Sequence, residues 1–410
     1  MEHLRIAVWH NLPSGGGKRA LYDHVRGLVA RGHEVEVWCP PTADLKFLPL
    51  ASLVREHVVD LDWPVPPRRA DKWQITLEIE RSIAAMDAHC RRCAEAINRG
   101  GFDVLFANSC QFFRTTSIGR FAAIPTVLYL QEPYRYLYEA MPRLCWLAPA
   151  SREGVGLRLA NVRAAFSDLR RVRNWRIQAR EEVDNAAAFT RIFSNSYFSR
   201  ESILRAYGLD STVCYLGIDV DHFVDRHLQR EDFLVGFGSI TWEKNIRLAI
   251  EAVGATAPPR PKLAWVANVV DRTLLAETTD LASSREVVFE PMIRISDADV
   301  VDILNRAMAM VYAPRLEPFG LAPLEGNACG LPVIAVAEAG VRESIVDHVN
   351  GLLVEHDPHS IAAAIDRLRT DPELARQLGI RGRLAVETKW SLAAATDRIE
   401  QQLARYARHR

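Results

Sequence analysis

The chain of 410 residues is 49% hydrophobic and 25% charged, and its 51 basic and 51 acidic side chains give a formal net charge of zero. The length and composition predict a globular protein with two or three domains. The balanced charge excludes a broad nucleic-acid-binding surface, and no apolar run approaches the length of a membrane span. Seven scattered cysteines, and an N-terminus that reads as a strand instead of a signal peptide, predict a cytoplasmic protein.

The N-terminal segment has the pattern of a βαβ unit. Residues 4–10 (LRIAVWH) form a short apolar run that is followed by the glycine cluster 15–17. Residues 21–32 have helical periodicity with Gly32 as the stop, and residues 33–39 (HEVEVWC) alternate as a strand. Strand, glycine turn, helix and strand in this order imply a parallel sheet.

Further apolar runs extend this pattern into two series. The first series continues at 103–109, 124–130, 188–196 and 212–217, and the second comprises 233–239, 262–268, 285–290, 309–314 and 331–336. We therefore predict an α/β protein with two Rossmann-like domains, residues 1–220 and 221–390. The final helix, within 391–410, is expected to pack across their junction.

The section between residues 134 and 185 differs from the rest of the chain. It begins with the aromatic and apolar stretch YRYLYEAMPRLCWLAP and continues into a long arginine-rich helical pattern. These helices could cover the sheet and solvate one face. The alternative is an amphipathic surface that contacts a membrane or a lipid-linked substrate.

Two helix starts are candidates for anion binding. Gly16 and Gly17 lie where the first strand meets the first helix, and a helix N-terminus offers free N–H groups to an anion. The spacing is neither a dinucleotide fingerprint nor a Walker A loop, so a structural turn remains an alternative. Lys244 is predicted in the first turn of a helix, where a cation is unfavourable unless an anion binds beside it.

The nonapeptide EPFGLAPLE places Glu317 in a loop after the strand 309–314 and Glu325 one turn inside the next helix. In an open parallel sheet, ligands bind at the carboxyl ends of the strands. Two carboxylates around one helix N-terminus suit a ligand with hydroxyl groups at both ends and an anion between them, as in a nucleotide-sugar. The alternative is that both are helix-start acids favoured by the helix dipole.

Residues 317–358 resemble the signature region of the family-4 glycosyltransferases. The E-x7-E spacing, ACGLPVIA, GVRES and NGLLV follow in order, and upstream YLGIDVDHF and WEKNIRLAI resemble the domain junction and the phosphate-binding helix of that family. The resemblance implies a retaining, metal-independent hexosyltransferase of the GT-B fold, with two Rossmann-like domains facing each other across a cleft. Its donor would be a UDP- or GDP-linked sugar, and its acceptor and oligomeric state are left open.

The resemblance also implies roles for individual residues. Glu317 would contact the transferred sugar, Lys244 would neutralise the diphosphate, and Glu325 would bind the ribose hydroxyls. The backbone of Phe319, Gly320 and Leu321 would meet the sugar and the phosphates. Gly16 and Gly17 would give room to the phosphates and the acceptor on the opposite wall.

The chain departs from the family pattern at two places. Ser239 stands where the family usually has an arginine that contacts the diphosphate, and Gln131 and Glu132 stand where many members have a histidine near the sugar. These departures support an alternative function as a catalytically silent nucleotide-sugar-binding partner. A sugar-nucleotide epimerase or phosphorylase on the same fold is a further alternative.

Two motifs imitate metal sites. Cys90 and Cys93 form a lone C-x-x-C in a helical stretch, without the second pair or histidine that zinc needs. The D-x-D motif at 297–299 opens a helix, so Ser296 or Asp297 is the expected N-cap. We expect no metal and no other cofactor.

Overall fold

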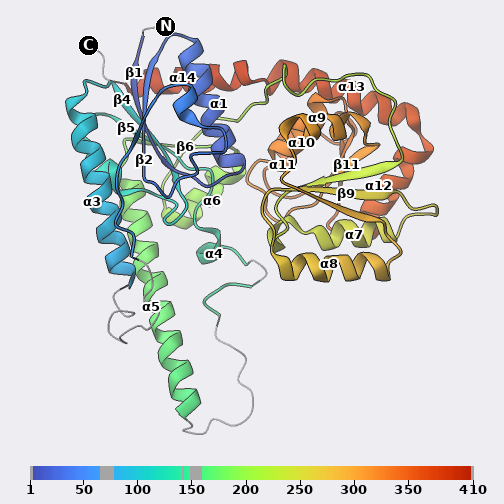
Figure 1. The fold of residues 1–410 in the computed structure, drawn as a ribbon, viewed down its shortest axis with the longest axis horizontal. Coiled ribbons are helices and arrows are strands. Elements are labelled where there is room, and N and C mark those ends of the chain that lie inside the picture. The colour runs from blue at the N-terminus through green and yellow to red at the C-terminus, as the bar shows by residue number, and fades with distance from the viewer. Residues whose placement is uncertain (1–2, 65–77, 141–142, 148–158, 408–410) are drawn as a thin grey trace. The chain divides into compact units, whose positions relative to one another are not determined.

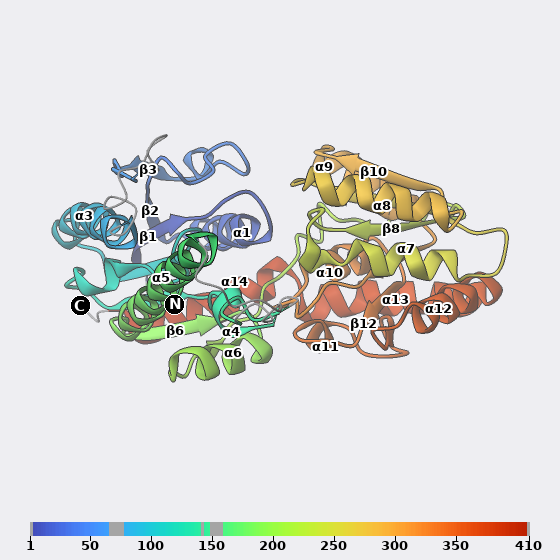
Figure 2. The ribbon, with the colours of Figure 1, turned by 90° about the horizontal axis from the view of Figure 1, so that it is seen from below.

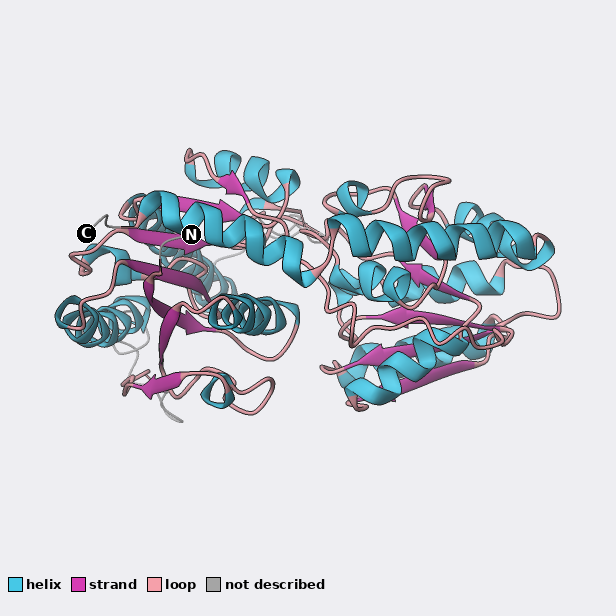
Figure 3. Ribbon diagram, turned by 90° about the horizontal axis from the view of Figure 1, so that it is seen from above, coloured by secondary structure: helices cyan, strands magenta, loops and turns pink. Residues whose placement is uncertain are grey.

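The computed structural model describes residues 3–64, 78–140, 143–147 and 159–407. The chain divides into two compact units, and the first consists of Met1–Ser194, Arg200–Val213 and Ile399–Arg410. The second consists of Asn195–Ser199 and Cys214–Arg398. Each unit contains one parallel sheet with helices packed against it (Figures 1 and 3).

The first unit contains a seven-stranded parallel sheet in the order β3-β2-β1-β4-β5-β6-β7. Its elements are β1 (Arg5–Asn11), α1 (Gly16–Ala30), β2 (Glu34–Cys39), η1 (Leu50–Ser52), β3 (Arg55–Val58), α3 (Glu78–Arg99), β4 (Val104–Cys110), η2 (Ser117–Arg120), β5 (Thr126–Tyr129), α4 (Arg135–Tyr138), α5 (Leu159–Ala187), β6 (Arg191–Ser194), α6 (Tyr197–Tyr207) and β7 (Thr212–Val213). Helices α1 and α3 lie on opposite faces of this sheet (Figure 2).

The second unit contains a six-stranded parallel sheet in the order β10-β9-β8-β11-β12-β13. Its elements are β8 (Phe233–Phe237), η3 (Trp242–Lys244), α7 (Ile246–Gly254), β9 (Lys262–Ala267), α8 (Arg272–Ser284), β10 (Phe289–Ile293), α9 (Asp297–Arg306), β11 (Ala309–Tyr312), α10 (Leu321–Ala328), β12 (Val333–Val336), α11 (Val341–Ser344), β13 (Leu352–Val354), α12 (Pro358–Thr370) and α13 (Pro372–Lys389). The last helix, α14 (Leu392–Tyr406), has its first residues in this unit and its last residues in the other.

The strands form where the sequence has short apolar runs, because both faces of a parallel sheet are covered by helices. All residues of β4, β5, β8, β11 and β12 are buried. The prediction of two parallel α/β domains is therefore confirmed. Among the described residues, no helix is both long and apolar enough to cross a bilayer.

The strand expected at 212–217 is only two residues long, Thr212–Val213. Three further strands differ from the prediction. The strand expected at 285–290 begins only at Phe289, because Glu286 has φ = +58° where the chain leaves α8. Strand β3 has the polar sequence REHV, with no residue fully buried, so it lacks the apolar signal of a strand. The third, β13, was part of the NGLLV motif but was not predicted as a strand.

The section 134–185 is helical only in part, and its described residues 143–147 form turn and coil. It contains α4 and α5, and residues 141–142 and 148–158 lie outside the described residues. Helix α5 extends beyond the sheet (Figure 1) and exposes Phe166 and Leu169 on its surface. Whether this surface contacts a membrane remains a prediction.

In both sheets the strand order reverses beside the first strand, at β1/β4 in the first unit and at β8/β11 in the second. Such switch points leave a crevice at the carboxyl ends of the strands, where ligands of α/β proteins bind. The candidate site residues follow these strand ends.

Candidate functional site

Glu317 lies in the loop after β11, at the switch point of the second unit. Its backbone carbonyl accepts a hydrogen bond from the N–H of Gly340 at 2.9 Å. Leu316, directly before it, has φ = +47°, a left-handed conformation that is uncommon for residues other than glycine. The loop is therefore held in a defined and strained shape, which is a feature of functional sites.

Lys244 lies after β8, the strand adjacent to β11. It is the last residue of η3 and not, as predicted, in the first turn of α7; the left-handed Asn245 (φ = +52°) separates the two helices. The Lys244 Nζ atom is 2.6 Å from the Oε2 atom of Glu317, and both side chains are partly buried. The two residues predicted as catalytic thus form a direct ion pair.

Tyr312, the last residue of β11, lies close to this pair. Its side chain is buried. Burial, and then the neighbouring charges of Glu317 and Glu325, raise the pKa of its hydroxyl well above the usual value, so the hydroxyl keeps its proton. Sequence reasoning missed Tyr312, although its place at a strand end could have marked it.

Helix α10 begins beside the ion pair. Gly320 precedes its first residue, Leu321, with φ = +87°, which favours glycine at this position. Glu325 lies one turn inside the helix, as predicted, and its side chain is buried. Helix α10 begins directly after the loop that carries Glu317. The first N–H groups of a helix have no partner within the helix, so those of α10 are close to this loop.

Phe319 contributes its backbone to this region and not its ring. The ring is 1% exposed and packs with Tyr215 (centroids 6.0 Å apart) and Trp390 (5.6 Å apart). This aromatic cluster anchors the residue before Gly320. The arrangement agrees with a role for the backbone of residues 319–321, but it does not test that role.

Ser239 follows Gly238 in the turn after β8. Gly238 has φ = +133°, and a Cβ atom there would lie 2.8 Å from Cγ of Lys244. The turn therefore fits closely around the lysine stem. Arg315 is a second cation near this turn, because its N–H donates to the carbonyl of Glu243 at 2.8 Å; its guanidinium is paired with Glu338.

The first unit brings together the other predicted residues. Gly16 is the first residue of α1, and a Cβ atom on Gly17 would lie 3.3 Å from Oε1 of Gln131, so the glycine turn and the end of β5 are neighbours. Glu132 is paired with Arg114 at 3.1 Å and Arg135 at 3.6 Å. The predicted residues thus form two sets, one in each unit.

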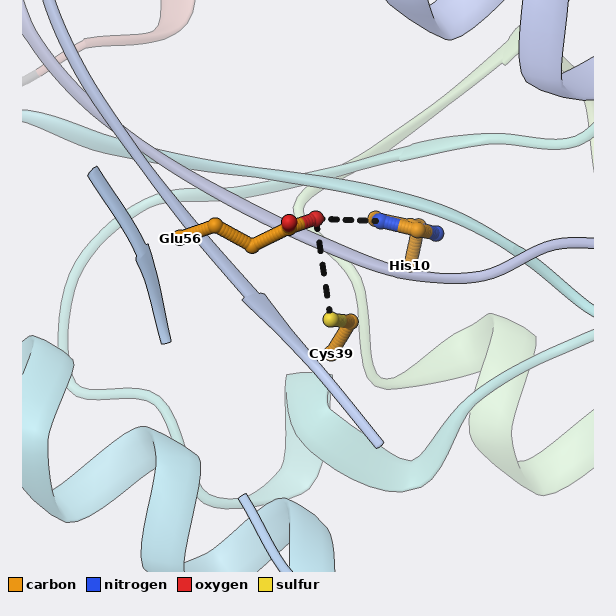
Figure 4. Close-up of side chains that lie close together, drawn as sticks. All are labelled: His10, Cys39 and Glu56. Carbon is orange, nitrogen blue, oxygen red and sulfur yellow. Dashed lines mark hydrogen bonds and ion pairs between the residues drawn. The ribbon is translucent and has the colours of Figure 1, made fainter. Parts of the chain in front are cut away.

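His10, Cys39 and Glu56 are the described residues that come closest to a metal site (Figure 4). Glu56 Oε1 is 3.8 Å from both His10 Nε2 and Cys39 Sγ. These are the donor types of a zinc site. Burial, however, raises the pKa of the Cys39 thiol to about 12, which opposes the thiolate that zinc requires.

The hydrogen bonds of His10 also oppose a metal. Its Nδ1 atom accepts the N–H of Leu12 at 3.3 Å, so a neutral ring carries its proton on Nε2, the atom that would bind the metal. Metal-binding histidines instead donate their second N–H to an acceptor. The buried ammonium of Lys18, 3.5 Å from His10 Nε2, adds a positive charge. We interpret the cluster as structural.

The two sequence motifs that imitate metal sites have structural roles. Ser296 caps α9 in a capping box with Asp299, so the first alternative for this N-cap is confirmed. Cys90 and Cys93 lie buried on α3, where Cys93 contacts His89 at 3.5 Å. Neither motif belongs to the metal-like group found among the described residues.

Comparison with known proteins agrees with this geometry. The family model described as Glycosyltransferase Family 4 matches residues 14–222, and that described as Glycosyl transferases group 1 matches residues 218–385. The human alpha-1,3/1,6-mannosyltransferase ALG2 is 28% identical over 235 residues, which cover 51% of this chain and 56% of that protein. The D-inositol 3-phosphate glycosyltransferase of Thermobifida fusca is 30% identical over 193 residues (45% of this chain, 41% of that protein).

Solved structures show the same fold along almost the whole chain. Anabaena HepE in complex with UDP has a TM-score of 0.70 at 15% identity, covering 98% of this chain and 100% of its own. Sucrose-phosphate synthase from Thermosynechococcus elongatus also has a TM-score of 0.70, at 17% identity and 98% coverage of both chains. The fold is the predicted GT-B fold. In contrast, the alignments span about half or less of the curated relatives. Because one family model covers more than half of the chain and a second continues where it ends, the chain belongs to glycosyltransferase family 4.

Proposed function

We propose that this protein transfers a hexose from a nucleotide-diphosphate sugar to an acceptor hydroxyl with retention of configuration. The observation that carries the proposal is the ion pair between Lys244 and Glu317 at the switch point of the second unit, beside the start of α10. Family membership and the UDP and UDP-glucose complexes of the structurally similar HepE support a nucleotide-sugar donor.

The leaving group of this reaction is a nucleoside diphosphate. When the bond between the sugar carbon and the phosphate oxygen breaks, its electron pair stays on the oxygen and negative charge builds up there. Lys244 and the first N–H groups of α10 would stabilise this charge, and such preorganised groups act without the cost of reorientation. On this proposal, a metal is not needed to neutralise the diphosphate.

Glu317 would then act on the sugar. Its carboxylate now binds the Lys244 ammonium, so in the absence of donor each group neutralises the other. We infer that the diphosphate competes for Lys244 and that the Glu317 carboxylate is thereby released to bind the sugar. Glu325, one turn further along α10, would bind the ribose.

Retention follows from attack on the face that the leaving group vacates. The acceptor oxygen forms the new bond to the sugar carbon, and its proton passes to the departing phosphate oxygen, so no protein nucleophile is required. The acceptor would bind at the turn of Gly16, Gly17 and Gln131 in the first unit. The exposed Phe166 and Leu169 on α5 are the reason to include lipid-linked acceptors among those tested.

A donor screen tests the proposal. The protein would be incubated with UDP-, GDP- and ADP-linked sugars, and thermal stabilisation and slow release of free sugar would be measured. We expect one donor to stabilise the protein and to be hydrolysed, and Glu317→Gln and Lys244→Ala to remove the hydrolysis. An NMR spectrum of the first sugar product would show the anomeric configuration, and inversion would contradict a retaining mechanism.

The uncharged Ser239 gives the screen a second informative outcome. If nucleotides bind but no donor is hydrolysed or transferred to any acceptor, the protein is a nucleotide-sugar-binding partner without activity. In that case Ser239→Arg, which restores the usual cation of the family, should create measurable turnover if the missing charge is the cause.

A further inference from the structure

A short segment that follows β6 and includes the start of α6, Asn195–Ser199, belongs to the second unit although the chain on either side belongs to the first. Its polar side chains are buried: Asn195 is 3% exposed, Ser196 0% and Ser199 1%. Buried polar groups need hydrogen-bond partners, so the partners of this segment show what it holds in place. Most of these partners lie within the segment itself, and one, the carbonyl of Pro318, lies in the loop of Glu317.

Ser196 donates to that loop directly. Its Oγ atom is 2.5 Å from the carbonyl oxygen of Pro318, the residue after Glu317, and it accepts the N–H of Ser199 at 2.9 Å. A serine hydroxyl has only one proton to donate. The other acceptors within reach of this hydroxyl are Ser199 Oγ at 3.0 Å and Asn195 Oδ1 at 3.5 Å. The Pro318 carbonyl is closer than either, so we assign the proton of Ser196 to it.

Glu343 forms a second set of hydrogen bonds to the same segment. Its carboxylate accepts the N–H groups of Tyr197 and Phe198, both at 2.9 Å, and the hydroxyl of Tyr215 at 2.8 Å. A carboxylate at the first N–H groups of a helix is favoured by the helix dipole. The start of α6 is thus bound to α11, which carries Glu343.

The segment of Ser196 and the segment of α11 both contact the backbone next to Glu317. Gly340, directly before α11, donates its N–H to the carbonyl of Glu317. It also packs so tightly that a Cβ atom there would lie 2.0 Å from the Pro318 carbonyl oxygen. Two consecutive carbonyls, those of Glu317 and Pro318, therefore each have a fixed donor, and the backbone that follows the Glu317 Cα atom is held at two successive points.

We propose that Ser196 is a positioning residue that sets the place of the Glu317 carboxylate through its hydrogen bond to the Pro318 carbonyl. This inference rests on the proposed function only for its effect on turnover. Without the Ser196 hydroxyl, the Pro318 carbonyl loses its donor and the peptide can rotate. Glu317 then reaches Lys244 and the sugar in a range of positions, and a shift of about 1 Å can cost roughly 100-fold in rate.

The kinetic test compares three variants in the donor assay. Ser196→Ala should lower kcat roughly 10- to 100-fold, with the KM for the donor and the affinity for the free nucleotide changed less than about threefold. Ser196→Thr keeps the hydroxyl and should restore most of the rate. Ser199→Ala is the matched control, because it disturbs the same helix start without touching Pro318, and it should keep the rate within about threefold of the wild type. Equal losses in Ser196→Ala and Ser199→Ala would overturn the proposal.

Hydrogen exchange gives a readout that does not depend on activity. In Ser196→Ala, the peptide covering residues 316–325 should exchange faster, whereas in Ser199→Ala the increase should stay within residues 195–201. If no donor is turned over by the wild type, the proposed function fails while exchange still tests the positioning. If residues 316–325 exchange equally in the wild type and in Ser196→Ala, the positioning role is refuted whatever the activity.

Discussion

The two sheets have the same strand order at their switch points but present different chemistry there. In the second unit, the crevice between β8 and β11 holds the ion pair of Lys244 and Glu317. In the first unit, the corresponding place between β1 and β4 holds neutral amides: the Gln111 amide donates to the Asn11 side chain at 3.1 Å, and Asn11 donates to Cys110 Sγ at 3.3 Å. On the proposed function, the diphosphate of the donor would bind at the second sheet and the neutral acceptor at the first.

Each unit also has a lysine close to its first glycine turn, and the two lysines differ in their exposure to solvent. Lys18 is completely buried, and burial lowers the pKa of its ammonium despite the nearby charge of Glu56. The side chain of Lys244 is 27% exposed and contacts a carboxylate directly. Lys244 is therefore available to a ligand, whereas Lys18 can be reached only if the first unit opens.

Replacing each lysine by methionine tests most directly whether the two lysines contribute differently to turnover. Lys244→Met should reduce turnover by roughly 100- to 1,000-fold, because it removes the cation that faces the leaving group. Lys18→Met should change the turnover of the folded fraction less than about threefold. Turnover of a screened donor, normalised to folded protein by circular dichroism, measures both. A comparable loss in Lys18→Met would mean that the first turn also binds an anion.

A fall in pH should destabilise the first unit more than the second. Burial lowers the pKa of His24, in the first unit, to about 4, so the folded state keeps this ring neutral while the unfolded chain takes up a proton below its ordinary value of 6.5. Stability is therefore lost as the pH falls from about 6.5 to 4, by at most about 3 kcal/mol for this group. Below pH 4 the ring is protonated in both states and the loss levels off.

The His24→Phe variant provides the control for this pH dependence. The ring of His24 packs edge-on against Tyr129 and Phe106, and its Nδ1 atom has no hydrogen-bond partner, so phenylalanine fits the same site. Urea unfolding at pH 7 and pH 5 should show a smaller difference in the variant. An unchanged difference would assign the acid sensitivity to other groups, among them His10, whose pKa burial also lowers to about 4.

A double-mutant cycle on Lys18 and Glu56 should give the smallest of these effects. Lys18→Met leaves the buried Glu56 carboxylate without the nearby ammonium, and adding Glu56→Gln removes that unpaired charge. We expect a coupling of about 1 kcal/mol in the free energy of unfolding, with no effect on the donor KM. Additive effects would show that the two charges do not interact.

Much of the fold could be predicted from the sequence. Short apolar runs marked most of the strands, because strands buried on both faces need uninterrupted hydrophobic residues. The polar edge strand β3 could not be predicted in this way, since Arg55, Glu56 and His57 carry no apolar pattern. Lys244 was assigned to the wrong helix because the left-handed conformation of Asn245 leaves no signature in a single sequence.

The two-sheet fold, the E-x7-E motif and the strand ends that carry Lys244 and Glu317 could be recognised in the sequence, because each depends on residues that are close along the chain. Tertiary structure alone decided that these two side chains form an ion pair across 73 residues and that Ser196 holds Pro318 across 122 residues. It also decided that His10, Cys39 and Glu56 meet beside a buried lysine. These contacts depend on which strands lie side by side, and that choice is made by the packing of the whole sheet.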